Sequence, residues 1–551
     1  MLRYPFPESI HTVGIFAPAK YPPPELYRLG REKLLSCGVA CKDTLPSRPW
    51  RFFAGSDDER LLALQKLLQD PEVDLLLAAC GGSGSARLLP RLDWQAWRKR
   101  NLPVVGYSDL TALHLAALRH GCRRHIHGPM LCRQWGDNAE AYAANMESLA
   151  AVLQESEQLL PSWHGARVLQ PGKAMGQLMP ANLTLLGALL ATPFLPELKG
   201  AILVLEDVHL PAHALDRALN QLRQAGILGA LAGLIFGQFS AAEDAEHIPD
   251  ILSEYATEIN GPVLCNLQFG HVNPSLSLPV GRLSHLQGSS TGEISLQLDS
   301  REKYRPEMFS RNGELLPYRL LAPENLEPGR QYPLVLLLHG AGERGTDNLK
   351  QLTHLATVFT RPELRQQHPC FVLVPQCPEG AQWVDSPWHA PSHLQNTNPA
   401  RPLQLALELL ESIQRQNPVD RKRVYVLGLS MGGFGTWDAV CRYPERFAAA
   451  VPICGGGDPR QAMRLHDLPV WAFHGAADHV VPPELSRRMV QALQECGGPV
   501  RYTEFPDCGH NSWDGALAHP QLLPWLFQQE KCCPPLSNPA PGQAPSQCND
   551  Q

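Results

Sequence analysis

The 551-residue sequence predicts an α/β protein made of two successive halves, each built on a largely parallel sheet. In the first half, apolar runs such as VGIFAPA alternate with amphipathic segments such as GSDDERLLALQKLLQD. The second half repeats this alternation, from PLVLLLHG through LQLALELLESIQRQ to VYVLGLS. Strands separated by helix-length segments indicate parallel strands joined by crossover helices. A chain of this length is also too long for one hydrophobic core.

The boundary between the halves is expected near residues 288–304, where a predicted edge strand runs into polar sequence. After about Leu169 the first half changes to apolar runs punctuated by Gly and Pro, which predicts a second, mixed subdomain. The Pro-, Ser- and Gln-rich end predicts a disordered tail. The predicted segments are two subdomains at 1–165 and 166–300, a linker at 301–317, a further domain at 318–530 and the tail at 531–551.

Composition and charge argue against nucleic acid and membrane partners. A net charge of −6 with interspersed charges gives no basic surface for nucleic acid. No apolar stretch approaches the ~20 residues of a membrane helix, and the N-terminus lacks the apolar run of a secretory signal. Fifteen scattered cysteines, Cys532 and Cys533 included, show no ligand spacing and are typical of reduced thiols in the cytoplasm. Without a metal-binding or phosphate-binding motif, neither metal nor cofactor is expected.

The second half contains the motif G-x-S-x-G, centred on Ser430 and preceded by the apolar run VYVL. Its glycines would permit the sharp strand-to-helix turn that lifts a serine hydroxyl out of a sheet. The motif often occurs by chance, so it indicates catalysis only if an acidic residue and a histidine follow at suitable places in the chain. Asp478, in WAFHGAADHVVP, and His510, in FPDCGHNSW, follow in the order Ser, Asp, His.

In this interpretation Ser430 is the nucleophile, His510 the general base, and Asp478 the group that orients the imidazole. Backbone amides of Ala341, in HGAG after the strand YPLVLLL, and of Met431 would form the oxyanion hole. The competing interpretation treats Asp478 as a loop-capping residue and His510 as a surface histidine. His474 and Cys508 are interpreted as packing and loop residues.

These motifs resemble the phospholipase/carboxylesterase and dienelactone-hydrolase-like group over about Tyr318–Gln529. The segments HGAGERGTDN, VPQ and HGAADHVVP carry the resemblance. It implies an α/β-hydrolase domain and acyl-transfer chemistry on a small ester or peptide substrate. It does not specify which substrate.

In the first half, LPVVGYSDLTALHLAALRHG places Ser108 between an apolar strand and a helix expected from Leu110. Two interpretations stay open, because Ser-Asp before a helical run is also a good N-cap. The glycine loop at residues 79–84 follows a strand and could offer amides to an oxyanion. Glu206 follows GAILVL at a strand end, and His271 is expected just after a strand.

Two other histidines compete with His271 for a catalytic role. His114 lies at helical spacing from Ser108 and is interpreted as a helix-surface or packing residue. His127, in HGPM, is a candidate for the pocket wall.

Over about Val13–Leu298 the first half resembles the LD-carboxypeptidases, cytoplasmic muramoyltetrapeptide carboxypeptidases, through GSDDERLLALQ, GYSDLTALH, ILVLEDV and FGHVNPSLSLPVG, among others. The resemblance implies a Rossmann-like subdomain with the nucleophile, followed by a mixed α/β subdomain. It makes Ser108 the nucleophile, His271 the general base and Glu206 the residue that orients it. Backbone amides of Gly82 and Asp109 would form the oxyanion hole.

The chain departs from the family pattern at two places. The family commonly has Arg-Gly-Gly-Tyr-Gly where this chain has residues 80–84, CGGSG, and Gly-Gly-Asn-Leu where it has residues 180–183, PANL. The first departure removes a cation and an aromatic ring near the pocket.

The activity that the resemblance implies is release of the terminal D-alanine from a murein tetrapeptide during cell-wall recycling, with a homodimer fitting the family. Two alternatives stay open. One is the immunity-type branch of the family, which cleaves a peptide-nucleotide antibiotic. The other is a first half that binds peptides without turnover, so that only the second half is an active esterase.

Overall fold

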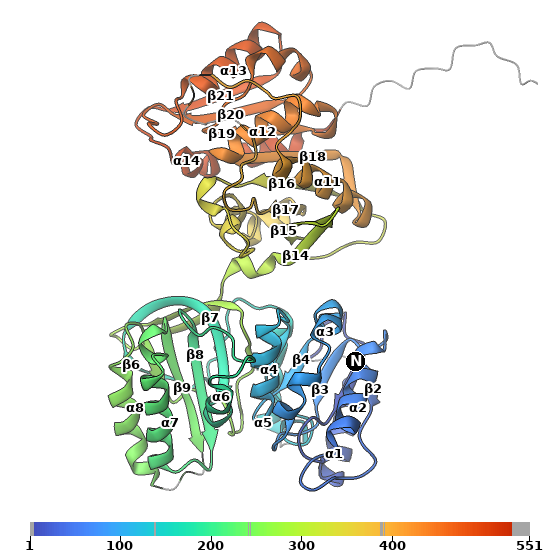
Figure 1. Ribbon diagram of the computed structural model, residues 1–551, viewed down its shortest axis with the longest axis vertical. Coiled ribbons are helices and arrows are strands. Elements are labelled where there is room, and N and C mark those ends of the chain that lie inside the picture. The colour runs from blue at the N-terminus through green and yellow to red at the C-terminus, as the bar shows by residue number, and fades with distance from the viewer. Residues whose placement is uncertain are drawn as a thin grey trace, which may run out of the picture. The chain divides into compact units, whose positions relative to one another are not determined.

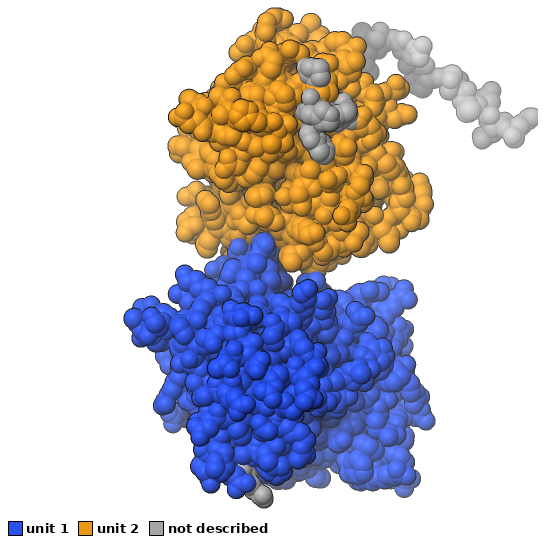
Figure 2. Space-filling model, turned by 60° about the vertical axis from the view of Figure 1, so that its left-hand side comes forward, with its two compact units in different colours: residues 1–302 blue, residues 303–551 orange. Residues whose placement is uncertain are grey.

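The structure is a computed structural model that describes residues 5–136, 139–240, 242, 244–385, 390 and 392–531. The chain divides into two compact units, Met1–Glu302 and Lys303–Gln551 (Figures 1 and 2). From residue 532 onwards the predicted tail lies outside the described residues. The predicted α/β fold class is confirmed in both units.

Unit 1 contains two sheets. The first has six strands in the order β11-β5-β4-β3-β1-β2, and its five adjacent strands from β5 to β2 are parallel. Its strands are β1 (Thr12–Phe16), β2 (Ala40–Asp43), β3 (Leu75–Ala78), β4 (Val104–Gly106), β5 (His125–His127) and β11 (Leu278–Pro279). The helices of this part are α1 (Pro24–Ser36), α2 (Asp57–Gln69), α3 (Trp94–Arg100), α4 (Leu110–Arg119) and α5 (Ala139–Leu153).

The second sheet of unit 1 has seven strands in the order β13-β12-β7-β8-β9-β10-β6, with β7 to β10 parallel. Its strands are β6 (Arg167–Gln170), β7 (Gly172–Asn182), β8 (Ile202–Val208), β9 (Gly233–Ser240), β10 (Val263–Cys265), β12 (Leu283–Gly288) and β13 (Ile294–Leu298). Its helices are α6 (Leu183–Leu189), α7 (Ala212–Gln224) and α8 (Ile248–Ala256).

The two sheets of unit 1 share one hydrophobic core. Leu110 and Leu113 of α4 belong to the same buried cluster as Leu183 and Leu186 of α6. The chain also returns from the second sheet to add β11 to the first, antiparallel to β5. The predicted division at residue 165 therefore separates two sheets that pack as one body.

Unit 2 has a single eight-stranded sheet in the order β14-β15-β17-β16-β18-β19-β20-β21, parallel from β17 to β21. Its strands are β14 (Arg305–Arg311), β15 (Glu314–Leu321), β16 (Tyr332–Leu338), β17 (Phe371–Pro375), β18 (Val419–Leu429), β19 (Ala449–Ile453), β20 (Val470–Gly475) and β21 (Val500–Phe505). Its helices are α9 (Leu355–Val358), α10 (Pro362–Gln367), α11 (Arg401–Gln416), α12 (Met431–Arg442), α13 (Glu484–Glu495), α14 (Ser512–Ala518) and α15 (Leu522–Gln528).

Successive residues of the central strand β16 pack on opposite faces of this sheet. Leu334 and Leu336 join the cluster that contains α11, α12 and α13 residues. Val335 and Leu337 join the cluster of α9, α14 and α15. Because a strand alternates its side chains, an unbroken apolar run is what a sheet covered on both faces requires.

The linker that the sequence predicts at residues 301–317 is instead structured. Strand β14 and the first half of β15 form a hairpin at the edge of the unit 2 sheet. Asn312 and Gly313 make its turn with φ of 51° and 83°, the left-handed pair that Asn-Gly favours. The segment is polar because the edge strand is largely exposed, so composition alone was misleading.

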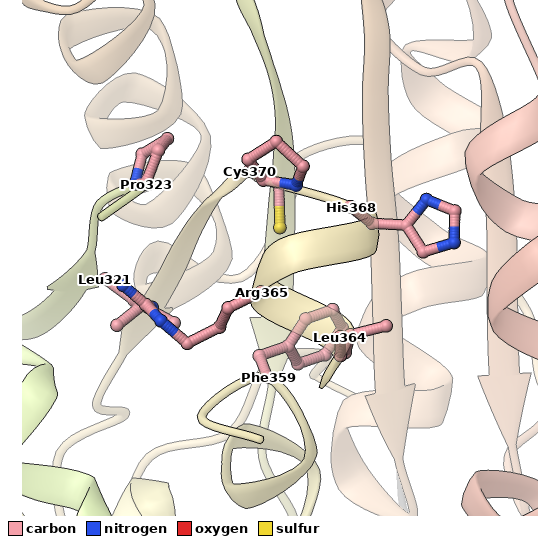
Figure 3. A pocket seen from close by; sticks show the side chains of 8 residues that line it. Leu321, Pro323, Phe359, Leu364, Arg365, His368 and Cys370 are labelled. Atoms are coloured by element: carbon pink, nitrogen blue, oxygen red, sulfur yellow. The ribbon is translucent and has the colours of Figure 1, made fainter. Parts of the chain in front are cut away.

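A shallow pocket lies beside α10 and the start of β17 (Figure 3). Cys370, which lines it, precedes the first residue of β17, so the pocket lies at the amino edge of the parallel strands. Ser430 follows β18 and lies at the opposite, carboxyl edge. We assign this pocket no role in the chemistry of Ser430.

Within the described residues, no helix combines the length and the apolar character that crossing a membrane demands.

The turn from β18 into α12 requires glycine for steric reasons. A Cβ on Gly432 would stand 1.9 Å from the carbonyl oxygen of Leu338, and one on Gly428 would stand 2.1 Å from that of Gly432. Both obstacles are backbone atoms, which cannot rotate away. The motif is therefore a packing requirement of this turn as well as a sequence signature.

We predict that Gly432→Ala destabilises unit 2 by about 3 kcal/mol or more, because overpacking against backbone cannot relax. Gly342→Ala is the matched control, since nothing lies within 4 Å of the added Cβ. Differential scanning calorimetry of the full chain measures both changes. Equal melting temperatures for the two variants would contradict the steric argument.

Candidate active sites

Ser108 directly follows the turn that ends β4, and it has a φ of 65°. L-residues rarely adopt this conformation, which is frequent at strained functional positions. Gly106 makes the turn possible, because a Cβ there would lie 2.4 Å from Cδ2 of Leu110. In this elbow Leu110 occupies the place of the second glycine of G-x-S-x-G. The absence of a side chain at Gly106, the first glycine, leaves room for the Leu110 side chain.

The structure brings the three predicted residues of unit 1 together. Nε2 of His271 lies 3.1 Å from Oγ of Ser108, and Nδ1 lies 2.7 Å from Oε2 of Glu206. In the tautomer that this geometry favours, Nδ1–H donates to the carboxylate and Nε2 accepts from the serine hydroxyl. His271 does not directly follow a strand as expected, but lies in the loop between β10 and β11.

Glu206 lies at the end of β8 and is fully buried. Burial raises the pKa of its carboxyl, and the hydrogen bond from His271 offsets only part of this effect. Nδ2 of Asn182 donates to Oε1 of Glu206 at 3.2 Å, while Oδ1 of Asn182 accepts from the amide of Leu185 and caps α6. Asn182 is thus a positioning residue that sequence reasoning missed, although an Asn before the helical run LTLLGALL was a visible N-cap signal.

The candidate oxyanion donors of unit 1 are connected to each other. Gly81 packs on the nucleophile, since a Cβ there would lie 3.0 Å from Oγ of Ser108. Its neighbour Gly82 has a φ of 129°. The buried carboxylate of Asp109 accepts from the amide of Ser85 at 2.8 Å, which ties the glycine loop to the start of α4. Burial raises the pKa of Asp109.

The two histidines that compete with His271, His114 and His127, are buried. His114 packs inside α4, with Nε2 2.8 Å from the carbonyl of Gly106 and Nδ1 2.9 Å from Nδ1 of His125. Burial lowers its pKa to about 4, so it is neutral at pH 7. His127, the candidate for the pocket wall, is buried, and its Nε2 stands 4.0 Å from Oε1 of Glu206.

In unit 2, Ser430 follows β18 with a φ of 53°. Nε2 of His510 lies 2.9 Å from its Oγ, and Nδ1 lies 2.8 Å from Oδ2 of Asp478. Met431 is the first residue of α12 and Ala341 the first of the short helix η7 (Ala341–Glu343). Amides at the first position of a helix have no partner within that helix, so both can serve an oxyanion.

Asp478 is held by more donors than its counterpart in unit 1. Its Oδ1 accepts from the amides of Val480 and Val481 at 2.8 and 2.9 Å. Burial alone would raise the pKa of this carboxyl, but hydrogen bonds from His474, His510 and the two amides lower it below its ordinary value. His474 is buried, as its packing interpretation requires, and it also stands 3.3 Å from Oδ2 of Asp478.

Three side chains at the unit 2 site are of types that can bind a metal ion. Side-chain atoms of Cys454, Asp478 and His510 lie within 4.8 Å of one another. Burial raises the pKa of the Cys454 thiol to about 12, so this thiol is neutral at pH 7. Because a metal ion binds the thiolate form, the neutral thiol disfavours a metal at this cluster. Cys508 is half-buried, and its Sγ contacts the carbonyl of Gly509 as a loop residue would.

The fold and the two sites define a pair of serine hydrolases. Profiles of the LD-carboxypeptidase N-terminal and C-terminal domains match residues 13–128 and 175–286, and the phospholipase/carboxylesterase profile matches residues 327–520. A probable murein peptide carboxypeptidase of Bacillus subtilis is 33% identical over 281 residues, which cover 49% of this chain and 86% of that protein. The murein tetrapeptide carboxypeptidase of Pseudomonas aeruginosa is 32% identical over 251 residues, covering 44% and 81%.

A solved structure of the microcin C7 self-immunity protein, an inactive mutant in its apo state, matches with a TM-score of 0.50 at 22% identity. The match covers 54% of this chain and 98% of that one, and it shows likeness of fold. From the profiles and the two carboxypeptidase relatives, the chain belongs to the LD-carboxypeptidase family. It also carries a phospholipase/carboxylesterase domain, so both predicted resemblances are confirmed.

The depressed pKa of Asp478 predicts a pH-dependent contribution to stability. Because its folded-state pKa lies below the ordinary 3.8, ionised Asp478 stabilises the fold above about pH 4, and this contribution is lost as the pH falls. We expect Asp478→Asn to destabilise unit 2 by about 1–3 kcal/mol at pH 7 and progressively less towards pH 3. Urea unfolding at both pH values, with exposed Asp467→Asn as control, measures this. An effect independent of pH would contradict it.

Proposed function

We propose that unit 1 is a carboxypeptidase that releases terminal D-alanine from murein tetrapeptides. The observation that carries the proposal is the hydrogen-bonded series Ser108, His271 and Glu206, at 3.1 and 2.7 Å. Relatives named as murein peptide carboxypeptidases supply the substrate class. Action in the cytoplasm, a role in wall recycling and a homodimer are parts of the same proposal.

In the proposed mechanism, Ser108 attacks the carbonyl while His271 takes its proton and then gives it to the leaving amine. Glu206 stabilises the imidazolium, and the amides of Gly82 and Asp109 stabilise the oxyanion. Water, activated by the same histidine, then releases the acyl group. The intact series of hydrogen bonds favours turnover over a unit that only binds peptides.

For unit 2 we propose hydrolysis of small esters or of peptide-type amides. Ser430 is the proposed nucleophile, His510 the base and Asp478 its orienting group, with the amides of Ala341 and Met431 as the oxyanion hole. The distances of 2.9 and 2.8 Å along this series support the assignment.

The two sites are expected to be separable. Ser108→Ala should lower D-alanine release from a murein tetrapeptide by at least about 10³-fold, because a triad acts as a unit. It should leave hydrolysis of p-nitrophenyl acetate intact, and Ser430→Ala should do the reverse. Loss of D-alanine release only in Ser430→Ala would refute the assignment of unit 1.

A carboxypeptidase must also hold the free carboxylate of the residue that leaves. The stem of exposed Lys20 lies across the glycine loop, with Cβ, Cγ and Cδ at 2.9–3.1 Å from the point where a Cβ on Gly82 would stand. The carbonyl of Lys20 accepts from Sγ of Cys80 at 3.3 Å, which fixes its backbone there. The stem of Lys20 thus lies beside the proposed oxyanion hole, and we propose that its ammonium binds the carboxylate of the leaving residue.

We expect Lys20→Gln to raise KM for the tetrapeptide by about 10–100-fold, because a charge-assisted hydrogen bond to the carboxylate is lost. The wild type should also discriminate against a substrate whose terminal carboxylate is an amide, and the variant should not. Lys199→Gln is the control, since Lys199 is exposed near the other end of β8 from Glu206. Retained discrimination in Lys20→Gln would exclude this role.

A further inference from the structure

A small cavity lies beside the nucleophile of unit 2. Its lining includes Leu429, the residue that precedes Ser430, together with Glu343, Gln351 and His354. Glu343 belongs to the same short helix, η7, as the proposed oxyanion donor Ala341. The cavity therefore adjoins the two chain segments that carry the nucleophile and this proposed oxyanion donor.

Two residues that line this cavity each have a buried acceptor oxygen without a partner among the described residues. They are Oε2 of Glu343 and Oε1 of Gln351. The Gln351 residue is 3% exposed, and its amide group donates to Asn348 instead. The side chain of Glu343 is 13% exposed. A buried carboxylate oxygen without a donor is costly, so such an atom points to a ligand that supplies one.

Among the described residues, the charged side chains beside Glu343 leave its Oε2 without a hydrogen-bond donor. The guanidinium of the neighbouring Arg344 donates to the carbonyls of Ala341 and Ala381. His354 stands 3.6 Å from Oε1 of Glu343, beyond hydrogen-bond distance and on the other oxygen. Oε2 belongs to a side chain that lines the cavity, and it keeps its acceptor capacity.

The carboxylate of Glu343 and the nucleophile Ser430 both lie close to Gly340. From the point where a Cβ on Gly340 would stand, Oε2 of Glu343 is 3.0 Å away and Cβ of Ser430 is 3.7 Å away. The rings of His354, Trp513 and His510 pack in sequence around the site, with centroids 5.1 and 5.5 Å apart. A group held by Glu343 would therefore lie within a few bonds of a carbonyl attacked by Ser430.

We propose that Glu343 and Gln351 form a subsite for a primary ammonium group, so that unit 2 acts on aminoacyl esters or amides. An ammonium has three N–H donors and is compact, which suits a small cavity with two acceptors. In an aminoacyl group the nitrogen is about 2.5 Å from the scissile carbonyl carbon. The inference rests on Ser430 being the nucleophile, as proposed above.

The test compares two 1-naphthyl esters of nearly equal shape, L-alaninate and isobutyrate, in which a methyl group replaces the ammonium. The full-length wild type should show kcat/KM at least about tenfold higher for the alaninate. Glu343→Gln, which keeps the shape and removes the charge, should lower this ratio at least about tenfold. Glu363→Gln, an exposed charge on α10 at the opposite edge of the sheet, should keep the wild-type ratio.

A second test uses two diphenyl phosphonates, one with an aminoethyl group and one with an isopropyl group. The rate at which each probe labels Ser430 reports the reactivity of this residue without turnover. Equal wild-type rates for the aminoethyl and isopropyl probes, or an equal loss with both esters in Glu343→Gln, would overturn the subsite alone. Absence of labelling at Ser430 together with absence of ester hydrolysis would overturn the proposed function of unit 2, and the subsite with it.

Discussion

Both sites depend on one backbone constraint, a serine held at positive φ between the carboxyl end of a parallel strand and the start of a helix. Ser108 has a φ of 65° and Ser430 a φ of 53°. The conformation is unfavourable for an L-residue, so the surrounding packing must impose it. It turns the hydroxyl out of the sheet and leaves amides at the helix start available, so the nucleophile and the candidate oxyanion donors arise from the same turn.

The two units meet this constraint with different supporting architecture. In unit 2 one sheet supplies every member, and Asp478 keeps a depressed pKa because backbone amides and imidazoles donate to it. In unit 1 the second sheet must deliver Glu206 and the loop with His271 to a serine on the first. Glu206 is more deeply buried, and its pKa is raised. The hydrogen bond from Asn182 to Glu206 is therefore important. A buried carboxylate with few donors is strongly destabilised when one donor is removed.

Sequence reasoning predicted the α/β class from the alternation of strands and helices. It named the three residues that meet in unit 2 from a motif and the order of its partner residues, and the three that meet in unit 1 from the family resemblance. It missed what depends on contacts between distant elements. Strand β11 joins the first sheet from far along the chain, and the bond from Asn182 to Glu206 crosses between strands. The hairpin at Asn312-Gly313 was predicted to be a linker because its sequence is polar, although Asn-Gly is a typical hairpin turn. Unpartnered oxygens, such as those of Glu343 and Gln351, can be recognised only once every neighbour is known.

The charges beside the two nucleophiles have opposite signs. Lys20 lies against the glycine loop of unit 1, and Glu343 lies against the oxyanion loop of unit 2. A cation selects a free carboxylate, and an anion selects a free ammonium, which are the two termini that every linear peptide carries. Under the two proposals the chain combines sites that read opposite ends of short peptide fragments. Such sites need not compete for one bond, since each would engage the terminus that the other cannot bind.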